Sequence, residues 1–131
     1  MRVLLDTHTL VWYAFADPKL STTSRTLIAN PANEILISPV SYWEIAIKVS
    51  LKKWQLQQSY DDLIDSLWTV YGFVILPILP KHTTRLIQLP YPPNHRDPFD
   101  RLLVAQAVVE GIPMVSADPK FDLYAVPRVW G

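Results

Sequence analysis

Short apolar runs alternate along the chain with longer segments in which apolar residues recur every three or four positions. Continuous apolar runs occupy residues 3–5, 35–37, 73–78 and 112–116. Runs of this length are typical of strands that are buried on both faces of a sheet. A further run at 126–130 is interpreted as a short last strand. The pattern therefore predicts four or five strands.

Helical periodicity fills the segments between these runs, and Ser21, Ser38 and Ser59 are expected to cap helices that follow them. The predicted helices cover 9–15, 21–29, a segment that begins at Pro39, 60–71, 81–87 and 98–110. Strands that alternate with helices imply parallel pairing, with helices on both faces of the sheet. In such a sheet, ligands bind beyond the carboxyl ends of the strands.

The helix that begins at Pro39 carries the clearest apolar periodicity. Its apolar residues recur at steps of three and four, at Val40, Trp43, Ile47, Leu51 and Trp54. We expect this stripe to face the core. Glu44 and Lys48 lie one turn apart on a neighbouring face, where they either form an ion pair or take part in a functional site.

Composition narrows the class of protein. A chain of 131 residues is long enough for one domain, 1–131, and too short for two. The formal net charge is zero, so no global basic field holds nucleic acid. The absence of cysteine excludes disulfides, thiolate zinc sites and a cysteine nucleophile, and fits a reducing cytosol. No apolar run approaches the ~18 residues of a membrane span, so we expect a cytoplasmic protein without membrane contact.

The stretch 95–107 brings charged residues to the start of a predicted helix. Pro98 suits the first helical position because it has no N–H to lose there, and Asp97 before it can cap the free N–H groups. Asp100 falls at the third helical position, where a carboxylate is either a partner of the helix dipole or a ligand. We interpret Asp97 chiefly as a helix cap, and both interpretations of Asp100 stand.

Three further acids are expected at the same edge of the sheet. Asp6 directly follows a predicted strand, Asp118 comes two residues after another, and Glu44 lies near the start of the helix that follows the second strand. A helix that follows a parallel strand begins at the edge where that strand ends, so these three acids are expected to share one rim. Asp100 also lies near the start of a helix. The alternatives are an ordinary loop acid for Asp6 and a turn residue for Asp118.

Several carboxylates at one rim imply a cation. They repel one another, and without compensation some of them take up protons. Oxygen ligands without cysteine, and without histidine at metal-ligand spacing, point to Mg²⁺ or Mn²⁺. Such an ion can activate water and stabilise the charge that develops when a phosphodiester is cleaved. We interpret His8, His82 and His95 as satisfied polar or surface residues, and the tryptophans as core or interface residues.

Four motifs resemble those of a nuclease family. They read LDTH at 5–8, SYWEIAIK at 41–48, HRDPFDR at 95–101 followed by AQA at 105–107, and SAD at 116–118. Over nearly its whole length the chain resembles a PIN-domain ribonuclease of the VapC type, the toxin half of bacterial toxin–antitoxin pairs. The glycine that usually follows the lysine-bearing helix of this family is absent here.

The resemblance implies a three-layer α/β/α PIN-like domain with a central, mostly parallel sheet of four to five strands. It also implies a metal-dependent endoribonuclease, in which metal-activated water attacks the phosphorus and leaves a 5′-phosphate and a 3′-hydroxyl. The three core acids of the family correspond to Asp6, Glu44 and Asp100. Its fourth, more variable acid corresponds to Asp118, and Asp97 is expected to contribute from outside the ligand set.

Expected partners are RNA, an antitoxin encoded by an adjacent gene, and a second copy of the chain. Lys48, Arg96 and Arg101 are expected to hold RNA phosphates, with Thr7 and Ser116 beside the acids. By the resemblance, the antitoxin inserts an arginine or lysine into the acidic rim. High apolar content and five tryptophans favour a two-fold symmetric homodimer with both acidic rims along one groove.

Two other functions are alternatives to the nuclease. One is a non-enzymatic module that keeps the fold and binds only a partner protein. The other is a receiver-like pocket that binds Mg²⁺ and accepts a phosphoryl group. Such a pocket needs paired acids after the first strand, whereas Thr7 and His8 follow Asp6 here.

Overall fold

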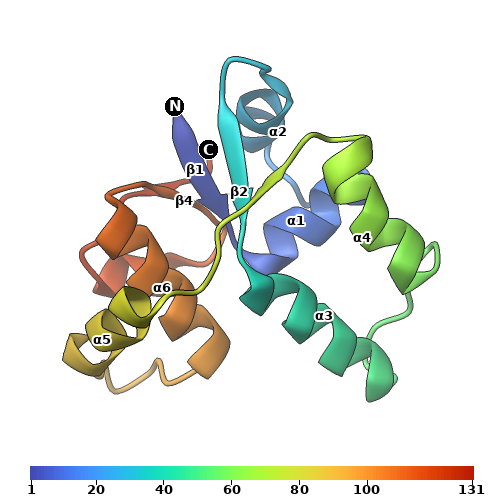
Figure 1. Cartoon of the computed structure of the whole chain (residues 1–131). Coiled ribbons are helices and arrows are strands. Elements are labelled where there is room, and N and C mark those ends of the chain that lie inside the picture. Colours follow the sequence, from blue (N-terminus) through green and yellow to red (C-terminus); the bar gives the residue numbers. More distant parts are fainter.

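A parallel sheet of five strands forms the centre of the molecule, which is described by a computed structural model of residues 1–131 (Figure 1). The strands are β1 (Arg2–Leu5), β2 (Glu34–Ile37), β3 (Val74–Ile75), β4 (Met114–Val115) and β5 (Arg128–Val129). Their order across the sheet is β3-β2-β1-β4-β5, and every neighbouring pair is parallel. In the register, Val3 lies opposite Ile35 and Leu5 opposite Val115.

Six α-helices and one 3₁₀-helix connect the strands. They are α1 (Thr7–Ala14), α2 (Thr22–Ala29), α3 (Pro39–Ser50), α4 (Tyr60–Thr69), α5 (Pro80–Gln88), α6 (Pro98–Glu110) and the 3₁₀-helix η1 (Pro119–Leu123). The predicted caps are confirmed, because the side chains of Ser21, Ser38, Ser59 and Asp97 each accept a hydrogen bond from a backbone N–H of the helix that follows. Helix α6 ends at Gly111 in the left-handed conformation, with φ 67°, which glycine adopts without a steric cost.

Alternate residues of the central strands point to opposite faces of the sheet. Val3 and Leu5 belong to an apolar cluster that α1, α2 and α4 cover, and Leu4 belongs to a second cluster under α6 and η1. Helix α5 packs on α6 from outside. The predicted three-layer α/β/α arrangement with a parallel sheet is therefore confirmed.

Several elements differ from the prediction, and β4 and β5 are shorter than predicted. The first helix begins at Thr7, two residues early, because the Asp6 carboxylate accepts a hydrogen bond from the Thr9 N–H and caps it. The third strand has only two residues, and both are exposed at the edge of the sheet. The 3₁₀-helix η1 after Asp118 was not predicted. No helix is long and apolar enough to cross a membrane.

The predicted buried stripe of α3 is confirmed only for Val40. The helix ends at Ser50, so two of the five stripe residues lie beyond it, and the side chain of Trp43 is 58% exposed. The buried residues of α3 are Val40, Ser41, Glu44 and Ile45. This face is buried because Ser41 and Glu44 face the polar Thr7 at the rim of the sheet, an interaction that hydrophobic periodicity does not register.

The connections leave a crevice between β1 and β4. The chain leaves β1 toward the helices of one face and leaves β4 toward η1 on the other face. In open parallel sheets, ligands bind at the point where the connections diverge in this way, beyond the carboxyl ends of the strands. Asp6 directly follows β1, and Ser116 directly follows β4.

Candidate active site

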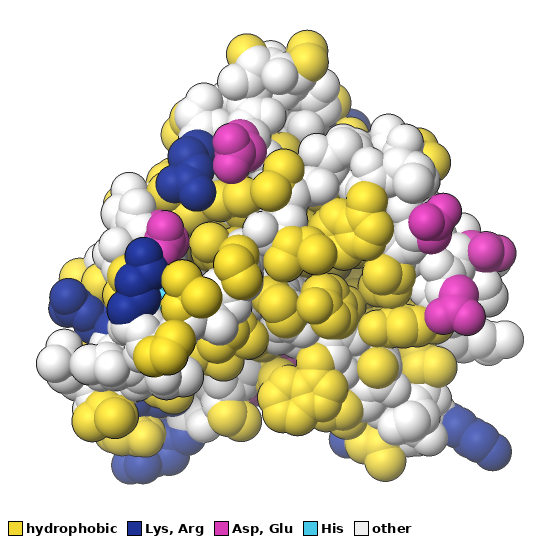
Figure 2. Space-filling view, viewed as in Figure 1, with side chains coloured by type: hydrophobic (Ala, Val, Ile, Leu, Met, Phe, Trp, Pro, Cys, Tyr) yellow, Lys and Arg dark blue, Asp and Glu magenta, His cyan; other side chains and the backbone are white.

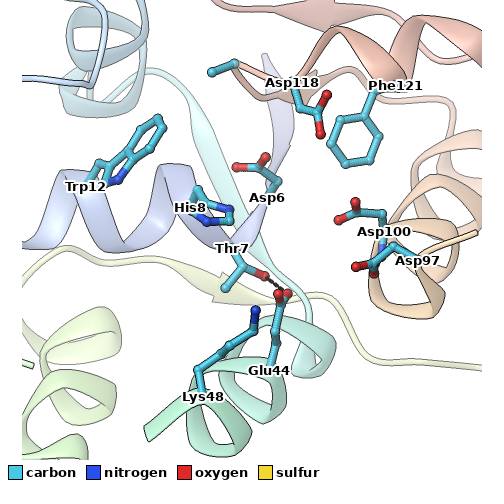
Figure 3. A pocket seen from close by; sticks show the side chains of 11 residues that line it. Asp6, Thr7, His8, Trp12, Glu44, Lys48, Asp97, Asp100, Asp118 and Phe121 are labelled. Carbon is cyan, nitrogen blue, oxygen red and sulfur yellow. Dashed lines mark hydrogen bonds between the residues drawn. The ribbon is translucent and has the colours of Figure 1, made fainter. Parts of the chain in front are cut away.

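A pocket of about 330 Å³ lies at this crevice. Five carboxylates line it, from Asp6, Glu44, Asp97, Asp100 and Asp118, and Figure 3 shows them around one opening. They come from the segments that follow β1 and β4, from the second turn of α3 and from the start of α6. Thus the structure brings together the four acids selected from the sequence, together with Asp97.

Asp6 and Asp118 are joined through one serine. The Ser116 hydroxyl donates to Asp6 Oδ2 at 2.5 Å and accepts from the Asp118 N–H at 3.0 Å. The other Asp6 oxygen accepts from the Thr9 N–H at 2.9 Å. The Asp118 carboxylate caps η1 by accepting from the Lys120 N–H at 2.9 Å. Both residues therefore cap helices, which the sequence did not predict, and both also line the pocket.

Glu44 is held from the opposite wall. The Thr7 hydroxyl donates to Glu44 Oε1 at 2.7 Å, and the same Thr7 oxygen lies 3.1 Å from the Ser41 hydroxyl oxygen. Glu44 is only 6% exposed, although it is charged. Lys48, one turn later, makes no ion pair with it, and its ammonium lies 5.6 Å from the centre of the Trp54 ring.

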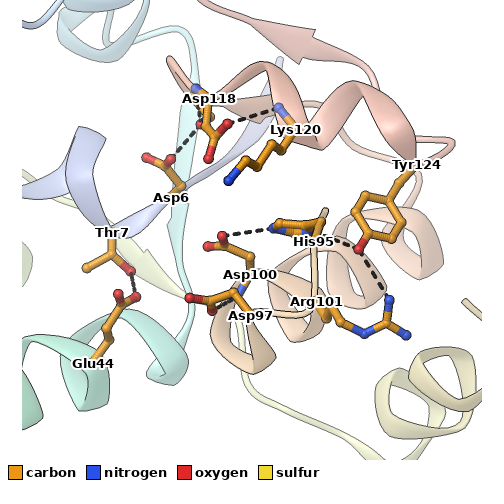
Figure 4. A network of polar contacts seen from close by, with 11 residues as sticks. Asp6, Thr7, Glu44, His95, Asp97, Asp100, Arg101, Asp118, Lys120 and Tyr124 are labelled. Carbon is orange, nitrogen blue, oxygen red and sulfur yellow. Dashed lines mark hydrogen bonds and ion pairs between the residues drawn. The ribbon is translucent and has the colours of Figure 1, made fainter. Parts of the chain in front are cut away.

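Asp97 and Asp100 occupy the first turn of α6 (Figure 4). Asp97 caps the helix, as predicted, by accepting from the Asp100 N–H at 3.0 Å. The Asp100 carboxylate lies 3.1 Å from His95 Nε2, and His95 Nδ1 lies 2.7 Å from the Tyr124 hydroxyl oxygen. His95 is buried, between the rings of Phe121 and Tyr124. The Asp100 carboxylate is thus held by His95, whose own position is fixed by Tyr124.

Burial raises the pKa of three of these acids. It raises the pKa of Asp6 against the hydrogen bonds from Ser116 and Thr9, which oppose the shift. It also raises the pKa of Glu44, and the neighbouring charge of Asp97 adds to the shift. Burial raises the pKa of Asp100 to about 6. The hydrogen bond with His95 opposes this shift, and the charges of Asp97 and Glu44 add to it. The positive groups of the chain therefore do not fully balance the negative charge of these carboxylates.

Two of the three cations selected from the sequence lie elsewhere. The Arg101 side chain is 2% exposed, and its guanidinium donates to the Pro90 carbonyl at 2.6 Å and to the Tyr124 hydroxyl at 3.2 Å. Arg101 is thus closed to a phosphate, because α6 turns it inward toward the loop that precedes the helix. Arg96 is exposed, with its guanidinium 5.3 Å from the Tyr91 ring centre, and does not line the pocket. Only Lys48 lines it.

The role of His95 was missed from the sequence. The only local signal was its place in the proline-rich approach to α6, which is stiff enough to fix a side chain. Its contacts with Tyr124 and Phe121 span more than twenty residues, and no spacing rule connects these positions. The expectation that the histidines are satisfied polar residues holds for His82, which is buried against Glu110 at 2.8 Å.

The donor set fits a hard divalent cation. Its ligating atoms are carboxylate oxygens, and three of the acids have pKa values raised by burial, which a cation would reverse. No three acidic or histidine side chains form a group that could hold an ion directly in this arrangement. Mg²⁺ commonly keeps several of its waters and takes only one or two carboxylates, and a pocket of about 330 Å³ leaves space for those waters.

The chain belongs to the PIN-domain family, because residues 3–127 match the PIN domain. Among named relatives, Ribonuclease VapC22 of Mycobacterium tuberculosis is 28% identical over 133 residues, which cover 98% of this chain and 98% of that protein.

Two solved structures share the fold. VapBC2 from Rickettsia felis, bound to a DNA fragment from its promoter, superposes with a TM-score of 0.71 at 19% identity and covers 100% of both chains. VapBC-1 from nontypeable Haemophilus influenzae superposes with a TM-score of 0.64 at 16% identity and covers 98% of this chain and 97% of that one. At these identities the likeness concerns the fold.

Proposed function

We propose that this chain, acting as one domain over residues 1–131, is a metal-dependent endoribonuclease and the toxin of a toxin–antitoxin pair in the cytoplasm. The observation that carries the proposal is the pocket at the divergence of β1 and β4, in which five carboxylates from four elements converge. Membership of the PIN-domain family and the likeness to a VapC ribonuclease support it.

The proposed cofactor is Mg²⁺ or Mn²⁺, held at the rim formed by Asp6, Glu44, Asp100 and Asp118, with one or two of these carboxylates as direct ligands and the others bound through the waters of the ion. A bound divalent ion supplies a water of lowered pKa and neutralises the charge that develops on the phosphate. Asp97 lies beside the ligand set and adds negative charge that favours cation binding.

The remaining residues hold these acids in place. Ser116 fixes Asp6 and Asp118 relative to each other, and Thr7 fixes Glu44 across the pocket. We propose that Lys48 contacts an RNA phosphate, because it is the one lysine or arginine that lines the pocket. Fixed donors reduce the reorganisation that the acids need when charge develops on the substrate.

Cleavage of single-stranded RNA by the purified chain tests the proposal. Cleavage is expected with Mg²⁺ or Mn²⁺, to stop with excess chelator, and to leave 5′-phosphate and 3′-hydroxyl ends. Asp61→Asn, which changes an exposed acid on α4, is the matched control for Asp100→Asn. Full activity in chelator would exclude the metal mechanism, and a metal-loaded, folded chain that cleaves no RNA would favour the non-enzymatic module.

A protein partner is proposed for the same pocket. Its uncompensated acids attract a cationic side chain when no metal is bound, and the neighbouring gene product is expected to supply one. Co-expression with that product should suppress RNA cleavage. Unchanged cleavage in the co-purified pair would contradict the partner proposal and leave the nuclease proposal intact.

A second copy of the chain is proposed for the apolar face in Figure 2. The edge strand β3 and the segment after it expose Val74, Ile75, Ile78 and Leu79, and Trp43 on α3 is also exposed. Monomers rarely leave such a patch and an unpaired strand edge uncovered. Light scattering should give twice 15.0 kDa, and Ile75→Lys should return the chain to the monomer mass. A monomer mass for the unaltered, active chain would exclude the dimer.

A further inference from the structure

A second cleft opens directly beside the acidic pocket. It has a volume of about 540 Å³ and lies between α1 with the turn after it and the loop at 53–57. His8 and Trp12 line both cavities, so the two are continuous. Figure 3 shows these two rings on the wall next to Asp6. An extended ligand that enters the acidic pocket therefore has a path into the cleft.

Aromatic rings form much of the cleft wall. The His8 ring lies 5.7 Å from Trp12 and 5.4 Å from Trp54, measured between ring centres, and meets both at steep angles. None of the three residues is buried. Because the rings are tilted rather than stacked on one another, mutual contact does not cover whole ring faces, although Trp12 also meets the Trp130 ring and Lys48 lies over Trp54. A flat aromatic ligand can stack on such faces.

The lysine and glutamine side chains of the cleft have no hydrogen-bond or ion-pair partner within the chain. Lys19 and Lys53 are exposed and form no ion pair, and the side-chain amides of Gln55 and Gln57 make no hydrogen bond. The Lys19 ammonium lies 5.9 Å from the centre of the Trp12 ring. One acid, Asp17, also lines the cleft, and it accepts a hydrogen bond from the Lys19 backbone N–H. The cleft thus offers stacking faces, cations and free amides together.

We propose that this cleft binds an unpaired nucleotide of the RNA substrate next to the cleavage point, with its base stacked on Trp54 or Trp12. This inference rests on the proposed function and adds a recognition subsite to it. Single-stranded RNA is held by aromatic stacking and by hydrogen bonds to base edges, while cations contact its phosphates. Lys19 and Lys53 contact phosphate here, and Gln55 and Gln57 face the base edge. A base within a duplex has no free face and does not fit.

An apolar protein segment suits the cleft less well. It would leave the two lysines and the two amides facing a ligand without phosphates or base edges, which costs their solvation without replacing it. The continuity with the acidic pocket also favours a ligand whose phosphate lies there while a neighbouring base lies in the cleft. A protein occupant is therefore an outcome to be tested.

Binding of two matched ligands separates stacking from charge. In the Asp100→Asn background, which is expected to leave RNA uncut, the ligands are an oligouridylate and an abasic ribose-phosphate chain of the same length. We expect Trp54→Ala and Trp12→Ala each to weaken oligouridylate binding about tenfold, which corresponds to about 1.4 kcal/mol. Binding of the abasic chain should not change. Trp54→Phe should keep most of the affinity, because it keeps an aromatic face.

Trp68→Ala is the control, because Trp68 is also partly buried against the same apolar cluster but lines no pocket. It should lower the thermal midpoint as Trp54→Ala does, without affecting oligouridylate binding. Equal losses for both ligands, or no loss for either, would overturn the stacking subsite. So would a Trp54→Ala variant that binds oligouridylate normally but no longer binds the neighbouring gene product.

These outcomes are distinct from failure of the proposed function. If the unaltered chain cleaves RNA and the tryptophan variants bind oligouridylate normally, only the subsite is refuted. If the unaltered chain, folded and loaded with Mg²⁺ or Mn²⁺, cleaves no RNA, the nuclease proposal fails, and the subsite proposal falls with it.

Discussion

The acidic pocket and the neighbouring cleft share His8 and Trp12 but are built in opposite ways. Each of the five carboxylates in the pocket accepts a hydrogen bond from, or lies at hydrogen-bond distance to, a group of the chain. The cleft is lined by exposed lysines and glutamines without partners. One cavity is fixed and anionic, and the other is adaptable and cationic.

This difference corresponds to two separate tasks. Groups that hold an ion and stabilise developing charge act best when their positions are fixed beforehand. Groups that accept bases of different shape and phosphates along a flexible strand need freedom, since each RNA presents them differently. On this basis, changes in the pocket should mainly alter the cleavage rate, and changes in the cleft should mainly alter affinity.

The largest effect is expected from Asp100→Asn. We expect single-turnover cleavage to fall by about a hundred- to a thousandfold or more, because a ligating charge is lost where the phosphate charge develops. Oligouridylate affinity should change little, because the cleft is intact. An equal loss of affinity and rate would remove the distinction between the two cavities.

His95 should affect cleavage through Asp100. His95→Ala removes the group 3.1 Å from the Asp100 carboxylate, so Mn²⁺ affinity, measured by titration calorimetry, should fall roughly 10- to 100-fold. His95→Gln keeps an amide donor and should restore much of that affinity. If both variants bind Mn²⁺ equally poorly, His95 acts only through packing between Phe121 and Tyr124.

The metal-free chain should become more stable on mild acidification. Burial raises the pKa of Asp100 to about 6, so its charge destabilises the fold above that pH. The penalty disappears as the pH falls from about 6 toward the ordinary value of 3.8. Glu110 and Asp122 have lowered pKa values, so their charged forms stabilise the fold. This stabilisation is lost only below about pH 4.5.

Urea unfolding in chelator is the measurement. Between about pH 7.5 and about pH 5, we expect a gain of about 1–2 kcal/mol in the free energy of unfolding. Asp100→Asn should show a smaller gain, because the group that titrates is gone. A constant or falling stability over this range would show that the charge of the pocket is already compensated.

The smallest effect is expected from Lys53→Ala in the cleft. Loss of one phosphate contact should weaken oligouridylate binding a few-fold and lower the slope of log affinity against log salt by about 1. Lys81→Ala is the control, because Lys81 lies on α5 and pairs with Glu110 at 3.2 Å. Equal salt slopes for both variants would place the phosphate contact elsewhere.

The sequence by itself determined the features that depend on residues close together in the chain. The cap at Asp97, Pro98 at the first helical position and Gly111 at the end define α6 within single turns, so its bounds follow from local rules. The apolar runs correctly indicated that β1, β2 and β4 are buried, but not that β3 is exposed at the edge of the sheet. Parallel strands end at a common edge of the sheet. The positions of Asp6, Glu44 and Asp118 after predicted strands therefore also placed these acids at one rim.

Only the tertiary structure decided which face of each helix is buried and which distant side chains meet. Trp43 was predicted to be buried and is exposed, whereas Glu44 is buried because Thr7 lies opposite it. Arg101 points inward, since Tyr124 and the Pro90 carbonyl accept its hydrogen bonds. These outcomes depend on contacts with residues far away in the chain. The periodicity of apolar residues carries no information about such contacts. The same holds for the cleft, which exists only because the loop at 53–57 folds back against α1.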